Sequence, residues 1–181
     1  GIQSANWCNG EGSREKEAVI LQQPDDGGDF RLGMRIRQMG AEFGATTGRP
    51  RRTGWLDLPV LRYAKWFSGK KVALTKIDVL DSQSVIKICD SYRYVGPDYR
   101  FGETKLTSGD VIKVAIPQSE VMECCQPLYV EFPGWQCDIT SCKKWHDLPE
   151  SVRDIIRFIE GHANVEIVMV SVGSDREQTI F

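Results

Sequence analysis

Hydrophobic residues recur at helical spacing in three stretches of the 181-residue chain. The first stretch begins at Phe30, and Gly44 is expected to end it because glycine is common just beyond a helix C-terminus. Its apolar positions lie three and four residues apart, as on one face of a helix. They are Leu32, Ile36, Met39 and Phe43.

The second and third stretches each begin with a helix-start signal. Asp57 is an N-cap candidate with Pro59 in the first turn, and Ser68 and Gly69 are expected to end this helix. Pro149 opens the third stretch, which predicts an amphipathic helix. The predicted buried faces are Leu58, Leu61, Ala64 and Phe67 in the second helix, and Val152, Ile155, Ile156 and Ile159 in the third.

Short, mostly apolar segments after the second and third helices are candidate strands. They cover 72–75, 85–89, 111–116, 128–132 and 165–170. The polar, glycine-containing residues 93–110 predict a hairpin or a long loop, and 1–28 predict a loop with one short strand at 18–21. The alternation of helices and strands indicates an α/β fold.

Composition and charge narrow the function classes. Hydrophobic residues make up 41% and charged residues 27%, as in a globular domain. The formal net charge of -2 gives no strong field that would attract nucleic acid or an anionic membrane. No apolar run approaches the roughly 20 residues that span a bilayer. We therefore expect neither nucleic-acid binding nor a membrane-embedded chain.

The cysteines allow two interpretations, a metal site or reduced thiols. No Cys-x-x-Cys pair is present, and the two histidines do not stand at zinc-finger spacing from the cysteines. We therefore predict no metal site in this chain and reduced thiols, some of them buried. The residues concerned are Cys8, Cys89, Cys124, Cys125, Cys137, Cys142, His146 and His162.

A basic loop at 46–54 is the first candidate for ligand chemistry. It carries Arg49, Arg51 and Arg52 around a glycine and a proline. Arginine binds carboxylates and phosphates through two parallel hydrogen bonds, so the loop is a candidate anion site. The alternative is a solvated or partner-facing basic patch, which loops of this composition often form.

A Lys-x-Asp sequence at the end of a predicted strand is the second candidate. Lys76 and Asp78 follow the apolar run 72–75. The Asp carboxylate can accept hydrogen bonds from N1–H and the 2-amino group of guanine, and the Lys stem can lie over the base. The pattern is short, and the alternative is an exposed strand end with no ligand.

Five blocks of the sequence are more informative together than either candidate alone. They are 42–57, 73–81, 132–135, 145–149 and 171–177, and the longest, around the basic loop, is the most specific. In this order and spacing, the chain resembles the adenylosuccinate synthetases over about residues 29–181, whereas 1–28 form an unmatched, loop-like leader.

The resemblance implies a fold and a reaction. The fold would be the C-terminal part of a P-loop-GTPase-like synthetase, with a large central sheet flanked by helices. The reaction would join L-aspartate to IMP at the expense of GTP, giving adenylosuccinate, GDP and phosphate, with Mg²⁺ as cofactor. The family further implies a cytoplasmic, homodimeric enzyme of purine biosynthesis.

The resemblance also assigns residues to ligands. The loop that closes over aspartate would be Ala45, Thr46, Thr47, Gly48, Arg49, Pro50 and Arg51, and Arg49 would also contact IMP. The GTP-binding residues would be Arg51, Lys76, Ile77, Asp78, Ser171, Val172 and Gly173. Trp135 and Trp145 would have structural roles, and His146 is not expected to be catalytic.

The chemical centre is expected outside the printed residues. The family's glycine-rich phosphate loop, catalytic Asp, catalytic His and magnesium ligands have no counterpart here, so no catalytic residue is assigned. Three interpretations stay open. The chain, which begins with Gly1 and not Met, is a partial sequence of a working synthetase, an inactive short product that retains GTP and aspartate binding, or a non-functional or mispredicted gene product with an unrelated leader at 1–28. In each case we expect the 181 residues alone to be inactive.

Overall fold

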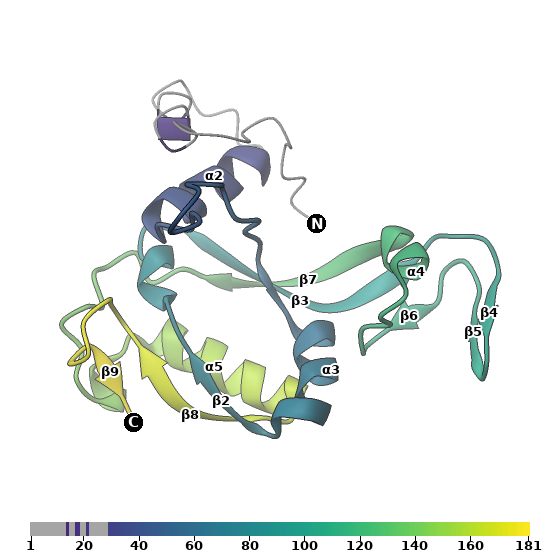
Figure 1. Ribbon diagram of the computed structural model, residues 1–181. Coiled ribbons are helices and arrows are strands. Elements are labelled where there is room, and N and C mark those ends of the chain that lie inside the picture. Colours follow the sequence, from purple (N-terminus) through teal and green to yellow (C-terminus); the bar gives the residue numbers. More distant parts are fainter. Residues whose placement is uncertain (1–13, 15–16, 19–20, 22–28) are drawn as a thin grey trace. The chain divides into compact units, whose positions relative to one another are not determined.

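A computed structural model describes residues 14, 17, 18, 21 and 29–181 of the chain (Figure 1). These residues belong to two compact units, 1–54 and 55–181. Helices and strands alternate along the second unit, which confirms the predicted α/β class. Of the strand expected at 18–21, only residues 18 and 21 are described. Both are helical, so that expectation is wrong.

Helix α2 (Asp29–Met39) dominates the described part of the first unit. The predicted helix is confirmed, but it ends at Met39 and not at Gly44. Ala41 takes a left-handed backbone conformation with φ 49°, which turns the chain away from the helix axis. Phe43 then pairs with Pro50 in an isolated β-bridge, so it belongs to the loop and not to the helix face.

One long strand, β3 (Val85–Tyr94), organises the largest sheet of the second unit. Antiparallel β7 (Cys125–Pro133) follows one of its edges over almost the whole length. The other edge pairs in parallel with β1 (Leu56–Asp57) and, further along, antiparallel with β6 (Val111–Ile112). The predicted strands at 85–89 and 128–132 are confirmed and are longer than expected, whereas the run at 111–116 is a strand only at its first two residues.

A second, three-stranded sheet contains β2 (Lys71–Leu74), β8 (Glu166–Ser171) and β9 (Thr179–Ile180). Strands β2 and β8 are parallel neighbours, and β9 returns antiparallel to β8. Strands were predicted at 72–75 and 165–170, and both are confirmed. Strand β9 was not predicted because it contains only two residues.

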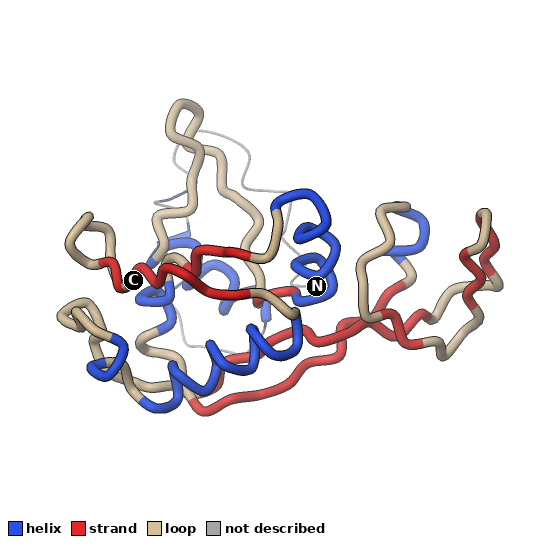
Figure 2. Tube along the Cα trace, turned by 90° about the horizontal axis from the view of Figure 1, so that it is seen from below, coloured by secondary structure: helices blue, strands red, loops and turns tan. Residues whose placement is uncertain are grey.

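Helix α5 (Glu150–Ala163) runs between the β2–β8 pair and strands β3 and β7 (Figure 2). Its four predicted core residues are all less than 9% exposed, which confirms the amphipathic assignment. Two of them pack toward Ile86 and Ile88 of β3, and the other two pack toward Val170 of β8. One helix face thus joins two hydrophobic clusters.

Helix α3 (Leu58–Ser68) begins and ends as the sequence predicts. The side chain of Asp57 accepts a hydrogen bond from the backbone N–H of Val60 (3.0 Å), and Gly69 follows the last turn with φ 83°. The predicted buried face is only partly correct, because Leu58 is 0% exposed but Phe67 is 78% exposed. Helical periodicity finds a face but does not tell how far along the helix that face stays covered.

The remaining elements extend from the far ends of β3 and β7 (Figure 1). Residues 93–110 include the predicted hairpin, formed by β4 (Tyr99–Phe101) and β5 (Thr104–Leu106). A short helix, α4 (Ser119–Glu123), was not predicted. It packs Val121 into a third cluster with Tyr92 and Ile112. Every helix among the described residues is too short or too polar to cross a lipid bilayer.

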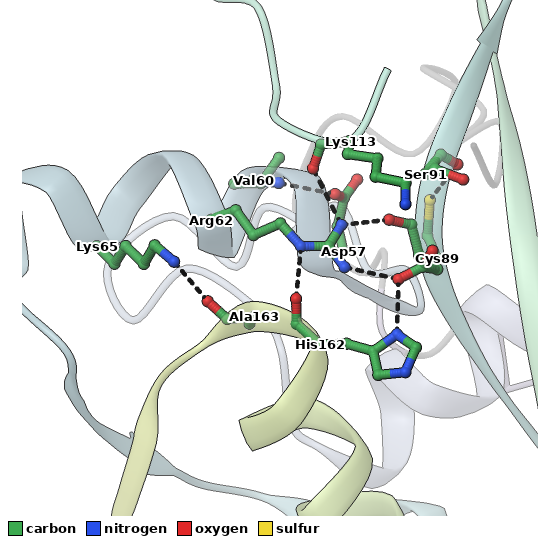
Figure 3. Close-up of polar contacts among 10 residues, drawn as sticks. Asp57, Val60, Arg62, Lys65, Cys89, Ser91, Lys113, His162 and Ala163 are labelled. Atoms are coloured by element: carbon green, nitrogen blue, oxygen red, sulfur yellow. Dashed lines mark hydrogen bonds and ion pairs between the residues drawn. The ribbon is translucent and has the colours of Figure 1, made fainter. Parts of the chain in front are cut away.

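A polar junction fastens α3 to β3 and to the end of α5 (Figure 3). Arg62 donates to the carbonyl of His162 (2.8 Å), to the carbonyl of Lys113 (3.0 Å) and to both the carbonyl and the side chain of Asp90. Lys65 donates to the carbonyl of Ala163 (2.7 Å). Because the last carbonyls of a helix have no intrahelical partner, these contacts satisfy the C-terminus of α5. We call this set of residues the Arg62 junction.

Candidate functional site

The carboxyl ends of β2 and β8 lie side by side because the strands are parallel, with Leu74 opposite Val170. The chain leaves β2 into residues 75–78 and leaves β8 into residues 171–173. Segments far apart in the sequence therefore meet at one edge of the sheet, where ligands of open α/β folds commonly bind. We call residues 75–78 and 171–173 the strand-end site.

The first wall of the strand-end site is a tight turn. Lys76 has a left-handed backbone (φ 59°), which is uncommon for a residue other than glycine, and it leads into the 3-10 turn Ile77–Leu80. Ile77 is 7% exposed and anchors the turn in the core. Asp78 Oδ1 is buried and has no hydrogen-bond partner among the described residues. Buried polar atoms are normally paired, so this oxygen is a candidate acceptor for a donor that the described residues do not supply.

The second wall is held by backbone and side-chain hydrogen bonds. The Ser171 hydroxyl donates to the carbonyl of Gly173 (2.9 Å), and the N–H of Val172 donates to the carbonyl of Gln178 (2.9 Å). Val172 is 0% exposed. A Cβ atom at Gly173 would lie 2.1 Å from the side-chain oxygen of Gln178, so only glycine fits there without displacing that side chain. Residues 171–173 are thus held in one conformation by these hydrogen bonds and by the side chain of Gln178.

The loop after β7 lies against both walls. Asp81 accepts hydrogen bonds from the Trp135 indole N–H (2.5 Å) and the Ile139 backbone N–H (3.2 Å). Burial raises the pKa of Asp81, and these two hydrogen bonds oppose the rise. Trp135 and Trp145 pack against the core, which confirms their structural assignment.

The basic loop belongs to the first unit and closes on itself. The N–H of Gly44 donates to the carbonyl of Arg49 (2.8 Å), and the N–H of Gly48 donates to the carbonyl of Gly44 (2.9 Å). Gly48 has φ 62°, the left-handed conformation that glycine adopts without strain. Of the seven residues predicted to contact aspartate, all but Pro50 are exposed. The backbone therefore presents the loop tip to solvent.

The arginines of this loop differ in their partners. Arg51 forms an ion pair with Glu42 (3.0 Å), and its backbone carbonyl accepts a hydrogen bond from the Arg37 side chain (2.7 Å). Neither Arg49 nor Arg52 has a side-chain ion pair within the described part of the chain. Arg49 and Arg52 thus have no charged partner among the described residues, whereas Arg51 is already paired with Glu42.

Two residues that support the strand-end site from outside it, Asp81 and Gln178, were missed by the sequence interpretation. Asp81 lies inside the block 73–81, but nothing in the local sequence shows that its partners come from residues 135 and 139. Gln178 follows the block 171–177 and likewise bonds to a distant residue, the carbonyl of Thr140 (3.3 Å). The signal that would have found them is the proximity of the three loops, which only the fold supplies.

The five described cysteines are free thiols, and two of them, Cys89 and Cys142, are buried. Burial raises the pKa of Cys142 and raises the pKa of Cys89 to about 11, so both stay protonated at neutral pH. Cys8 lies outside the described residues. No group of three or more metal-binding side chains is found in the part of the chain that is described. His146 is exposed, and its carbonyl accepts from Arg153 (3.2 Å).

A family model for adenylosuccinate synthetase matches residues 9–180. The chain belongs to the adenylosuccinate synthetase family. The match begins within the segment 1–28, so it extends further toward the N-terminus than the resemblance carried by the five blocks.

Individual synthetases of this family agree with the assignment. The chain is 44% identical over 149 residues to the adenylosuccinate synthetase of Trichlorobacter lovleyi and 43% identical over 150 residues to that of Geobacter sp. strain M21. Each alignment covers 82% of this chain and 32% of the relative. The fold resembles a solved structure, described as fully ligated adenylosuccinate synthetase from Plasmodium falciparum, with a TM-score of 0.71 and 34% identity.

The chain therefore spans about a third of the length of these relatives. The solved synthetase is covered over 33% of its own length by 82% of this chain. The α/β architecture of the described residues is thus that of a region of a synthetase.

Proposed function

We propose that this chain supplies the guanine-binding and aspartate-binding region of an adenylosuccinate synthetase. The complete protein would ligate L-aspartate to IMP with GTP, giving adenylosuccinate, GDP and phosphate. The observation that carries the proposal is the strand-end site, where the buried Oδ1 of Asp78 has no hydrogen-bond partner among the residues that the structure describes.

The chemistry of Asp78 fits a guanine base. An ionised carboxylate accepts hydrogen bonds and donates none, so it matches a base edge with two donors. Guanine offers N1–H and the 2-amino group there. Lys76, Ile77, Ser171, Val172 and Gly173 would surround the base.

The basic loop fits the aspartate end of the reaction. Aspartate carries two carboxylates, and an exposed, unpaired guanidinium such as that of Arg49 can hold one of them through two hydrogen bonds. Arg49 would also contact IMP, as the family implies, and Arg51 would face GTP once released from Glu42. Residues 45–51 would thereby place the aspartate amine for attack.

The reaction itself needs two bond exchanges. The γ-phosphoryl group of GTP moves to the 6-oxygen of IMP, which turns a poor leaving group into a good one. The aspartate amine then forms the C6–N bond as the C6–O bond breaks, phosphate departs and the amine loses a proton. Positioning and charge neutralisation dominate such phosphoryl transfer. The residues proposed here bind and orient, and the phosphate-handling residues belong to the rest of the protein.

The remaining parts of the proposal concern the complete protein. Magnesium would neutralise phosphate charge during the transfer, and no described residue is assigned to hold it. A homodimer and a cytoplasmic location are likewise proposed from the family alone.

A chimeric synthetase tests the proposed function. The T. lovleyi synthetase would receive residues 29–181 of this chain in place of its aligned segment, and it would be expressed in a bacterium that lacks its own synthetase and requires adenine. We expect the chimera to restore growth without adenine, as the parent T. lovleyi enzyme does. A soluble, folded chimera that fails to restore growth beside a parent that succeeds would refute the proposal.

A further inference from the structure

The loop 134–140 is hydrogen-bonded to Asp81 and to Gln178, and each of these residues is in turn bonded to one wall of the strand-end site. On the first wall, Asp81 binds Trp135 through one carboxylate oxygen (2.5 Å) and the N–H of Ile139 through the other (3.2 Å). The N–H of Asp81 also donates to the carbonyl of Asp78 (3.1 Å). One hydrogen-bonded 3-10 turn therefore links Asp81 to Asp78.

On the second wall, Gln178 forms an equivalent tie. Its side-chain nitrogen donates to the carbonyl of Thr140 (3.3 Å), and its side-chain oxygen accepts from the N–H of Asp175 (3.0 Å). Its own carbonyl accepts from Val172 (2.9 Å), and its side chain fills the space beside Gly173. Gln178 therefore connects the turn 171–175 to the same loop that Asp81 holds.

We propose that Asp81 and Gln178 are positioning residues, which use the loop 134–140 as a brace to fix the distance between the two walls of the base site. This inference rests on the proposed function, because it assumes that the walls hold the guanine of GTP. Neither residue needs to touch the nucleotide. Each acts by holding a segment that does.

The two hydrogen bonds of Asp81 are better explained by the geometry that they fix than by a contribution to the stability of the fold. Its burial disfavours the charged form, as the raised pKa of its carboxyl indicates. A carboxylate that loses water and regains two donors gives little net stabilisation. What the two hydrogen bonds do provide is a fixed geometry, because their acceptor lies at the end of the turn that carries Asp78.

Three substitutions in the chimeric synthetase test the brace. Asp81→Asn replaces one acceptor by a donor, Trp135→Phe removes the indole N–H and keeps an aromatic ring, and Gln178→Met keeps the length without hydrogen bonds. We expect each to raise the KM for GTP about tenfold, the usual loss for a charged or buried hydrogen bond. The KM for aspartate should stay within about twofold, because the loop that would contact it lies elsewhere in the chain.

The brace also predicts coupling and unchanged base preference. Asp81→Asn and Trp135→Phe both act on the hydrogen bonds of one side chain, so their effects should not add, and the double variant should be no worse than the more affected single variant by more than about twofold. The XTP-to-GTP preference should not change, because neither residue reads the base. Asp110→Asn is the matched control. Asp110 also accepts two hydrogen bonds, from the Thr107 N–H (2.8 Å) and hydroxyl (3.1 Å), but at a turn outside the strand-end site.

The outcomes separate the brace from the base assignment. Folded Asp81→Asn and Trp135→Phe variants with an unchanged KM for GTP would overturn the brace, and Trp135→Phe alone decides if Asp81→Asn does not fold. Equal rises in KM for all three substrates, or a changed base preference in Asp81→Asn, would also overturn it. The assignment of Asp78 to guanine is tested separately with the Asp78→Asn variant. If that assignment is wrong, this variant should keep the base preference of the wild type.

Discussion

The Arg62 junction and the strand-end site are both polar regions of the second unit, but they differ in whether their charged groups have hydrogen-bond partners. At the junction, Arg62 has four hydrogen bonds, and its partner Asp90 also meets His162 (3.2 Å). At the strand-end site, a buried oxygen of Asp78 has no partner within the described residues. Polar groups that hold a fold are paired, and an unpaired one at a strand end indicates a place for a ligand.

The largest expected effect is on the junction. Arg62→Met removes the donors of four acceptors and leaves Asp90 without its cation, and breaking such a shielded pair costs about 3–5 kcal/mol. We expect the free energy of unfolding of the chimeric synthetase to fall by that order, measured by urea denaturation. The matched control is Arg100→Met, which removes an exposed arginine of β4 and should change stability by less than about 0.5 kcal/mol. Equal stability of the two variants would show that the junction is dispensable.

For the Arg62 junction, the sequence predicted the ends of helix α3 but not the hydrogen bonds that join this helix to the rest of the unit. Asp57, Pro59 and Gly69 defined helix α3 correctly because capping acts within a few residues. The ties from Arg62 to His162 and Lys113 were not predictable, because their partners lie 100 and 51 residues away. For the same reason the length of β3 was underestimated, since β7 stabilises its second half from a distant part of the chain.

The strand-end site was predicted residue by residue, but its geometry was not. The family resemblance named Asp78 and Gly173 as members of one site, and the parallel pairing of β2 with β8 brings their segments to one edge. No local pattern in the sequence indicates that pairing. The brace residues Asp81 and Gln178 were missed because their role depends on a third loop, which neither block contains.

The next effect concerns Arg49 of the basic loop, which forms no ion pair with the described residues. In the chimeric synthetase, Arg49→Leu should raise the KM for aspartate about tenfold to a hundredfold, because one charge-assisted hydrogen-bonded pair is lost. Initial rates at varied aspartate, with GTP and IMP saturating, measure the change. Arg100→Leu serves as the control and should leave the aspartate dependence as it is. An aspartate KM that does not respond to Arg49→Leu would exclude the loop from aspartate binding.

A smaller effect is the pH dependence of the stability that ionised Asp90 contributes at the Arg62 junction. Burial acts against ionised Asp90, but the hydrogen bonds from Arg62 and His162 outweigh it and lower the pKa of the carboxyl. A lowered pKa in the folded state means that ionised Asp90 stabilises the fold above its unfolded pKa of about 4. This stabilisation is lost as the pH falls through the folded pKa.

Asp90→Asn should therefore destabilise the protein by about 1–3 kcal/mol at pH 7, the usual value for a hydrogen bond to a charged group. The gap between variant and wild type should narrow as the pH falls below about 4. Thermal unfolding at several pH values measures the gap. A gap that stays constant down to pH 3 would show that ionised Asp90 is not the source of the stabilisation.

The most direct test of the account is the base preference of the Asp78→Asn variant of the chimeric synthetase. Asn places an NH2 donor against a guanine donor, whereas xanthine carries an oxygen acceptor at position 2. The mismatch with guanine costs about 1–3 kcal/mol, so the ratio of kcat/KM for XTP over GTP should rise about tenfold to a hundredfold relative to wild type. The Asp110→Asn control should keep the wild-type ratio. A folded Asp78→Asn variant whose ratio equals that of wild type would contradict the proposal that this carboxylate reads guanine.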